Sequence, residues 1–173
     1  MNRSALELDR LTRDAARAEL TRCCGAWRWV EEMLERRPFE SREAVLRASD
    51  EVWATMGPGD WLEAFAHHPR IGERRAAAHD DSTAAAWSSE EQSAATSAGA
   101  DLRRRLAEAN EAYEHCFGHI FIVFAPGLGA DEILAIMESR MRNDAQTELR
   151  VAAEEQRKIT RRRLERVLDE GGQ

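Results

Sequence analysis

The sequence predicts an all-α protein, organised as a single-domain bundle of about eight helices over residues 1–173. Ala, Leu, Glu and Arg are abundant, whereas Val, Ile, Thr and Tyr, which favour strands, are scarce. Apolar residues recur at three- and four-residue spacing along most of the chain, which is typical of helices. The run HIFIVFAPGLG (residues 119–129) is β-like, but a lone strand has nothing to pair with. We therefore expect residues 119–129 to form a buried extended segment or a short helix.

Four helices are expected in the N-terminal half of the chain, approximately over residues 4–24, 26–36, 41–56 and 60–67. Pro38 ends the second, because the residue before a proline is disfavoured in the helical region. Ser41 is a typical N-cap for the third, which Gly57-Pro58-Gly59 ends. Pro69 ends the fourth.

The C-terminal half is expected to begin with a long loop over residues 70–87 and to continue with four more helices. Two of these helices cover approximately residues 88–99 and 101–116. Asp131 opens the next one, and either Asn143 or Asp144 caps the last, which extends to about Leu168. No repeat or low-complexity linker marks a domain boundary.

Composition excludes several classes of protein. The net charge of −7 argues against nucleic-acid binding. One basic run, RKITRRRLER (residues 157–166), is a phosphate-binding patch or, more simply, a solvated helix face with Glu154, Glu155 and Glu165 nearby. No apolar stretch is long enough for a membrane span, and MNRSALELDR at the start has no signal-peptide core. We expect a cytoplasmic protein.

Cysteine and histidine spacing gives little support for a metal or thiol site. Cys23, Cys24 and Cys116 are expected to be reduced and packed, since neighbouring cysteines pair poorly. His115 and His119 have the i, i+4 spacing of a metal-binding pair. Gly118 between them is expected to end the helix and so to break that geometry. No metal is therefore predicted.

His68 stands directly before Pro69 at the end of a short helix. The proline forces the histidine into an extended conformation and fixes the direction of the chain that follows. A histidine held in this way at a loop is a candidate functional group. It is equally well explained as a cation at a helix C-terminus. His67 is the competing histidine, and its side chain should point elsewhere.

Ser88-Ser89-Glu90-Glu91 fits a capping box, in which Ser88 and Glu91 bond to backbone donors at a helix start. This structural explanation is sufficient by itself. A functional role is compatible with this structural role, because a carboxylate fixed at a helix N-terminus is also a preorganised hydrogen-bonding group. Gln92 adds an amide beside it.

Arg163 is expected to lie on the apolar face of the last helix, although it belongs to the basic run. The other members of this face are Leu149, Ala152, Gln156, Ile159 and Val167. Arg161 and Arg162 lie off this face. A guanidinium turned inward needs an acceptor, which is either a protein carboxylate or an anionic ligand.

Three motifs follow one another along the chain: HPRIGE (His68–Glu73), WSSEEQS (Trp87–Ser93) and FGHIFI (Phe117–Ile122). With this combination the sequence resembles the OHCU decarboxylase family, whose substrate is 2-oxo-4-hydroxy-4-carboxy-5-ureidoimidazoline (OHCU). The resemblance covers nearly the whole chain. Further matching pieces are LTRCC (residues 20–24), RPF (residues 37–39), DEIL (residues 131–134) and the stretch 158–164. Members occur alone in bacteria and animals and fused to a hydroxyisourate hydrolase domain in plants.

The resemblance implies an enzyme of urate degradation that decarboxylates OHCU to (S)-allantoin without a cofactor and that forms a homodimer. It implies that His68 and Glu91 are the catalytic residues. Substrate contacts are implied for Pro69, Ser88, Gln92, His119, Ile120, Phe121, Ile122 and Arg163, with backbone groups acting in the segment 119–122. Two positions depart from the common pattern: His67 makes a double histidine, and His119 stands where an aromatic residue is frequent.

Two other classes of function compete with the decarboxylase. One is a non-catalytic helical module that binds nucleic acid or protein through residues 157–166. The other is a metal-dependent hydrolase that uses His68, His115 and His119.

Overall fold

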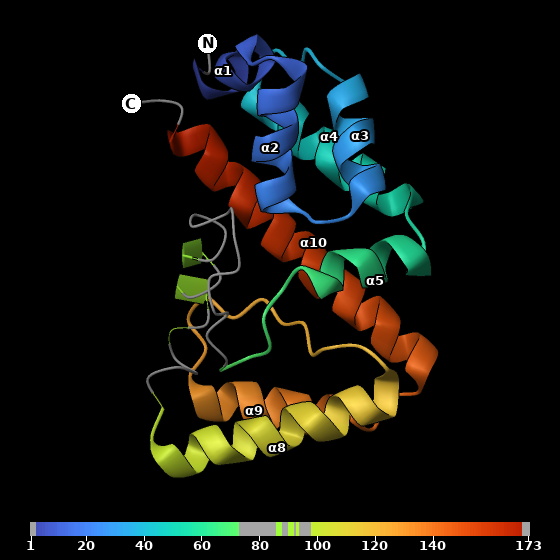
Figure 1. Ribbon diagram of the computed structural model, residues 1–173, viewed down its shortest axis with the longest axis vertical. Coiled ribbons are helices and arrows are strands. Elements are labelled where there is room, and N and C mark those ends of the chain that lie inside the picture. Colours follow the sequence, from blue (N-terminus) through green and yellow to red (C-terminus); the bar gives the residue numbers. More distant parts are fainter. Residues whose placement is uncertain (1–2, 73–85, 88–89, 92, 94–97, 171–173) are drawn as a thin grey trace. The chain divides into compact units, whose positions relative to one another are not determined.

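The computed structural model describes residues 3–72, 86–87, 90–91, 93 and 98–170 of the chain. In this part, eight helices have defined bounds and no strand occurs (Figure 1). The helices are α1 (Arg3–Arg10), α2 (Arg13–Cys23), α3 (Trp27–Glu35), α4 (Arg42–Thr55), α5 (Pro58–Ala66), α8 (Ala100–Phe117), α9 (Ala130–Arg140) and α10 (Ala145–Glu170). The predicted all-α class is confirmed.

Side-chain caps explain why several helices begin where the sequence predicts. Ser41 Oγ accepts the N–H of Ala44 at 3.1 Å and starts α4. Asp144 Oδ1 accepts the N–H of Thr147 at 2.9 Å in the same way, so Asp144 is the cap of α10. Of the helix predicted over residues 88–99, positions 90, 91, 93, 98 and 99 are described; the first three are helical, and the last two are not.

The prediction of one continuous first helix over residues 4–24 is wrong. The chain leaves the helical conformation after Arg10 and starts again at Arg13. Thr12 causes the break, because its side-chain oxygen accepts the N–H of Ala15 at 3.2 Å and its ψ of 160° is not helical. A threonine that bonds to the backbone in this way competes with helix continuation. Apolar periodicity does not report such a local interruption.

The chain forms two compact units, Met1–Ala64 with Arg157–Gln173, and Phe65–Gln156. In the first unit, α3 packs against α2 and α4, and α1 packs against α4. Its core includes the fully buried side chains of Trp29, Met33 and Leu164. At the surface, ion pairs from Arg13 and Arg17 to Glu31, at 3.1 and 2.8 Å, join α2 to α3.

In the second unit, α8 packs against α9 (Figure 1), and a continuous apolar core lies beneath them. Tyr113, Ile133 and Met137 are fully buried in this core. Residues 119–125 run into the core as neither helix nor strand, and the side chains of Phe121, Ile122, Val123 and Ala125 are buried. Of the two expected forms, a buried extended segment or a short helix, the structure shows a buried segment that is not helical. We refer to residues 119–125 as the buried segment.

Among the described residues, no helix has both the length and the apolar character required to cross a bilayer.

Candidate functional site

His68 lies in a turn that follows α5 in the second unit. Its side chain is partly buried, whereas that of His67 is exposed, as predicted. The backbone N–H of His68 donates to the carbonyl oxygen of Phe65 at 3.0 Å. Pro69 then ends the helical path. The histidine is therefore held by a backbone hydrogen bond on one side and by a proline ring on the other.

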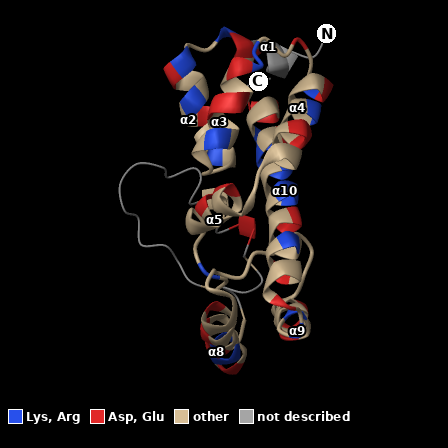
Figure 2. Cartoon of the chain, turned by 90° about the vertical axis from the view of Figure 1, so that its right-hand side faces the viewer, with Lys and Arg blue, Asp and Glu red and all other residues tan. Residues whose placement is uncertain are grey.

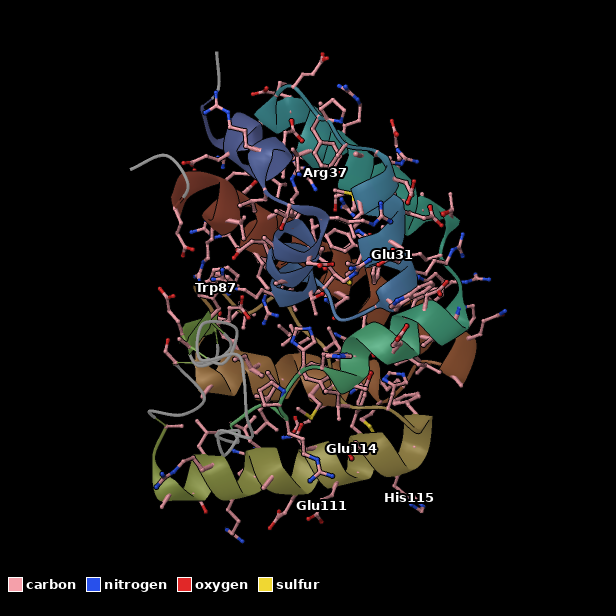
Figure 3. The ribbon with its side chains drawn as sticks, turned by 45° about the horizontal axis from the view of Figure 1, so that its top comes forward. Glu31, Arg37, Trp87, Glu111, Glu114 and His115 are labelled. Carbon is pink, nitrogen blue, oxygen red and sulfur yellow. The ribbon has the colours of Figure 1, made fainter. Side chains whose placement is uncertain are left out.

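The chain that leaves His68 is anchored to α8. Arg70 donates from Nε and Nη2 to the carboxylate of Glu114, the latter at 2.8 Å, and Glu114 is labelled on α8 in Figure 3. The buried Asn110 donates from Nδ2 to the carbonyl oxygen of Ile71 at 2.9 Å. A bidentate arginine–carboxylate pair and a buried amide bond both restrict backbone motion. They fix the position from which the His68 side chain extends.

The chain that enters His68 contacts the buried segment. The rings of Phe65 and His119 lie 5.3 Å apart between centroids. Tyr113 also packs edge-on against His119, at 5.6 Å. These contacts place the residue three positions before His68 against the first residue of the buried segment. Ile71 of HPRIGE and Phe121 of FGHIFI also belong to one buried apolar cluster, so the structure brings together two of the three sequence motifs.

His119 presents a polar atom within this aromatic cluster. Its Nδ1 lies 2.9 Å from the carbonyl oxygen of Ile120, so Nδ1 carries the hydrogen and donates it. In the neutral ring, Nε2 is then an acceptor. Nε2 is buried and forms no hydrogen bond with any described residue. A buried acceptor of this kind is suited to bind a ligand N–H or O–H.

The backbone of the buried segment also carries unused donors. Within the described part of the chain, the N–H groups of Phe121, Ile122 and Val123 donate no hydrogen bond. The next N–H, that of Phe124, donates to Glu155 Oε2 at 2.7 Å. Buried N–H groups without partners are rare, because losing water without replacement is costly. Three consecutive ones therefore indicate a place where a ligand accepts hydrogen bonds.

Glu91 is helical, as is the buried Trp87. The Glu91 side chain is partly buried, whereas that of its neighbour Glu90 is exposed. This difference indicates that Glu91 faces inward. Ser88 and Gln92, the other members of the predicted motif, lie outside the described residues.

Arg163 is buried in the first unit, as its helical face predicts. The residue is 5 % exposed, and its Nη1 donates to the carbonyl oxygen of Arg22 at 3.5 Å. The neighbouring Arg161 and Arg162 are 40 % and 46 % exposed. The predicted inward orientation is confirmed.

The thiols near Arg163 do not form a reactive centre. Cys23 and Cys24 are buried, and Cys116 is exposed, which differs from the predicted packing of all three. Burial raises the pKa of Cys24 to about 11, against the opposing effects of backbone and side-chain hydrogen bonds and of Arg163. A thiol with a raised pKa carries little of the nucleophilic thiolate at neutral pH.

The basic run 157–166 is largely neutralised by carboxylates. Arg157 and Arg161 both pair with Asp50, at 2.7 and 2.8 Å. Arg161 and Arg162 also lie 3.7 Å from Glu165. Figure 2 shows basic and acidic residues interleaved along α10. This pattern fits the solvated helix face and not a continuous phosphate-binding surface.

His115 and His119 do not share a helix face, because Gly118 ends α8 in the left-handed conformation, with a φ of 73°. His115 is exposed on α8 (Figure 3), whereas the His119 ring is turned toward the Ile120 carbonyl. The predicted break in the i, i+4 geometry is confirmed.

One buried polar cluster was missed at the sequence level. Arg140 donates to the fully buried Glu148 from Nε, at 2.8 Å, and from Nη2. Glu148 also accepts hydrogen bonds from the Tyr113 hydroxyl and from Asn143 Nδ2. A signal was present: Arg140 follows Ile133 and Met137 at helical spacing, so it shares their buried face. Arg140, like Arg163, is thus an arginine on the apolar face of its helix.

Comparison with known proteins places the chain in a family. The profile of the family described as OHCU decarboxylase matches residues 9–165. The chain is 34% identical over 148 residues to "Uric acid degradation bifunctional protein TTL" of Arabidopsis thaliana, covering 86% of this chain and 46% of that protein. It is 29% identical over 144 residues to "Uric acid degradation bifunctional protein" of Bacillus sp. (strain TB-90), covering 83% and 28%. The chain thus spans less than half the length of these curated relatives.

Two solved structures resemble this one. A crystal structure of OHCU decarboxylase in the presence of (S)-allantoin matches with a TM-score of 0.75 and 33% identity, covering 88% of this chain and 98% of that one. A crystal structure of (S)-allantoin synthase matches with a TM-score of 0.70 and 17% identity, covering 94% and 53%, and shows a shared fold. Since the family profile covers most of the sequence and the fold agrees, the chain belongs to the OHCU decarboxylase family.

Proposed function

We propose that this chain catalyses the decarboxylation of OHCU to (S)-allantoin. The observation that carries the proposal is the proximity of the anchored His68 turn to the buried segment, which offers three unused N–H donors. OHCU is rich in carbonyl and carboxylate oxygens, which are the acceptors that such donors bind. The solved relative that was crystallised in the presence of (S)-allantoin supports the same choice of ligand.

The reaction requires no external electron acceptor. When the carboxylate on C4 leaves as CO₂, its bonding electrons pass to C4 and are delocalised into the adjacent ring C=N. The nitrogen of that C=N takes up a proton from water. The C4 hydroxyl then loses its proton and becomes a carbonyl, while the ureido-bearing C5 gains a proton, so that the reaction as a whole consumes one proton. The substrate therefore supplies the electron sink that a cofactor provides elsewhere. The protein has to orient the ring, stabilise developing charge and deliver the proton to one face of C5.

In this proposal His68 and Glu91 bind the C4 hydroxyl and accept its proton as CO₂ departs. His68 then supplies the proton to C5, which makes the product a single enantiomer. Pro69 and residues His119 to Ile122 line the bound ring, with backbone N–H groups directed to its oxygens. Arg163 contributes a contact to the carbonyl or ureido oxygens, and Ser88 and Gln92 fix the orientation.

The test is a coupled assay in which urate oxidase and hydroxyisourate hydrolase generate fresh OHCU. Circular dichroism follows the formation of optically active allantoin, with and without EDTA. We expect rapid formation of one enantiomer, with no effect of the chelator. Decay of OHCU at its spontaneous rate to racemic allantoin would refute the proposed activity. Salt-dependent retention on DNA by the inactive protein would then favour the binding-module alternative.

Matched pairs of variants test the residue assignments. His68→Ala and Glu91→Ala are expected to lower kcat by about 10²–10⁴-fold, the usual contribution of general acid–base groups. His67→Ala and Glu90→Ala change the exposed neighbours and are expected to keep wild-type rates. The helical circular dichroism should stay unchanged in all four. A near-wild-type rate for His68→Ala or Glu91→Ala removes that residue from the mechanism.

We further propose that residues 1–173 act as a single domain and that the protein works as a cytoplasmic homodimer without nucleic-acid partners. A single cooperative unfolding transition, seen equally by near- and far-ultraviolet circular dichroism, is the expected sign of one domain. Light scattering coupled to size exclusion tests the dimer, for which twice the mass of 19.6 kDa is expected.

A further inference from the structure

The guanidinium of Arg140 contacts two consecutive residues of the buried segment. Its Nη1 donates to the carbonyl oxygen of Ile122 at 2.8 Å, and its central carbon lies 4.5 Å above the centroid of the Phe121 ring. Arg140 is 8 % exposed. One rigid, planar group therefore fixes a peptide oxygen and an aromatic face at the same time.

Glu148 keeps this guanidinium in place. It accepts hydrogen bonds from Arg140 Nε and Nη2, so that Nη1 is the nitrogen left to point at Ile122. The remaining acceptor capacity of Glu148 is taken by Asn143 Nδ2, at 2.8 Å, and by the Tyr113 hydroxyl. A carboxylate bound by this many donors has no other orientation available. The direction of Arg140 Nη1 is accordingly determined by the fold.

Fixing the Ile122 carbonyl also fixes a donor. A trans peptide is planar, so the N–H of Val123 points opposite to the C=O of Ile122. The His119 ring does the same at the other end, because its Nδ1 binds the Ile120 carbonyl and so sets the direction of the Phe121 N–H. Phe121 and Val123 are two of the three residues whose N–H groups have no acceptor among the described residues.

We propose that Arg140 is a positioning residue that aims the free N–H groups of the buried segment at the substrate. The guanidinium does not itself touch the substrate. It holds the Ile122–Val123 peptide plane, and Glu148 holds the guanidinium. This inference rests on the proposed decarboxylase function for its kinetic consequences, but the control of the peptide plane does not depend on that function.

Arg140→Lys separates positioning from charge. A single ammonium keeps the ion pair with Glu148 but cannot also reproduce the fork that reaches Ile122. We expect KM for OHCU to rise about tenfold, which corresponds to the loss of one charge-assisted hydrogen bond to a peptide that orients the ligand. The enantiomeric purity of the allantoin should also fall, because the ring is held less firmly.

Two control variants in the same unit are expected to leave KM and enantiomeric purity unchanged. Glu138→Ala removes an exposed carboxylate of α9, the helix that carries Arg140, without touching the Arg140–Ile122 hydrogen bond, so KM and enantiomeric purity should stay at wild-type values. Arg105→Lys alters an exposed arginine of the same unit, 3.7 Å from Glu138, and should change nothing. If Arg140→Lys does not fold, the double variant Arg140→Met/Glu148→Leu replaces both buried charges by apolar groups, an exchange that other proteins tolerate.

Hydrogen–deuterium exchange gives a readout that needs no activity. In Arg140→Lys or the double variant, amides of residues 119–125 should exchange at least about tenfold faster, with no change in Glu138→Ala. Wild-type exchange in this segment, or wild-type KM and enantiomeric purity in a folded variant that lacks Arg140, would overturn the inference. An inactive wild-type protein would instead refute the proposed function, and the exchange experiment would still decide the role of Arg140.

Discussion

Replacement of Glu148 by alanine is expected to be among the most damaging single changes in the second unit. Glu148 is fully buried and accepts hydrogen bonds from Arg140 Nε at 2.8 Å, Arg140 Nη2, Asn143 Nδ2 at 2.8 Å and the Tyr113 hydroxyl. Alanine leaves the guanidinium of Arg140, itself 8 % exposed, without its counter-charge. Removing one partner of a buried ion pair costs about 3–5 kcal/mol of unfolding free energy.

For a protein of this length, about 1 kcal/mol changes Tm by roughly 2–4 °C, so Glu148→Ala should lower Tm by roughly 6–20 °C. Urea unfolding followed by far-ultraviolet circular dichroism measures the same loss as a change in the midpoint. Glu138→Ala is the matched control, because its ion pair with Arg105 is exposed on both sides and 3.7 Å long. Exposed pairs contribute about 0–1 kcal/mol. If Glu148→Ala and Glu138→Ala unfold at the same urea concentration, the buried network does not carry the stability assigned to it.

Two further predictions concern the first unit. Thr12→Ala should lower the unfolding free energy by about 1 kcal/mol, because it removes the N-cap of α2. The control Thr21→Ala removes a hydroxyl bonded to the Arg17 carbonyl inside the same helix and should be neutral or slightly stabilising. Equal urea midpoints for the two variants would contradict the capping role of Thr12. Burial raises the pKa of Cys24 from 9.0 to about 11, so between these pH values the unfolded chain loses a proton that the folded one keeps. The unfolding free energy should therefore be unaffected by this group below pH 9 and fall by about 1.4 kcal/mol per pH unit above it, a slope that Cys24→Ala should reduce and that urea titrations at several pH values would measure.

Local features of the sequence predicted most of the helices and the burial of Arg163. Ser41 and Asp144 cap helices through hydrogen bonds to residues three positions away, which a short window of sequence contains. The burial of Arg163 followed from its place on an apolar helix face. These predictions succeeded because caps, prolines and i, i+4 periodicity act within one or two turns of chain.

The local sequence around Thr12 contained the signal for the helix break, although the predicted helix ran through it. Threonine followed by a helix-forming run is an N-cap signal, but the apolar period continued across it and masked the interruption. Two signals of similar range competed, and the hydrogen bond to Ala15 prevailed over the periodicity.

The sequence by itself determined the all-α class, the place of His68 before a proline, the inward face of α10 and the burial of the segment 119–125. The tertiary structure alone decided which distant groups meet: Arg70 with Glu114, Asn110 with the Ile71 carbonyl, and Arg140 with both Glu148 and the Ile122 carbonyl. The physical reason is that periodicity specifies which face of a helix is buried but not which partner that face meets. The partner depends on how side chains fill the core and on which buried donors and acceptors remain to be satisfied once it has formed.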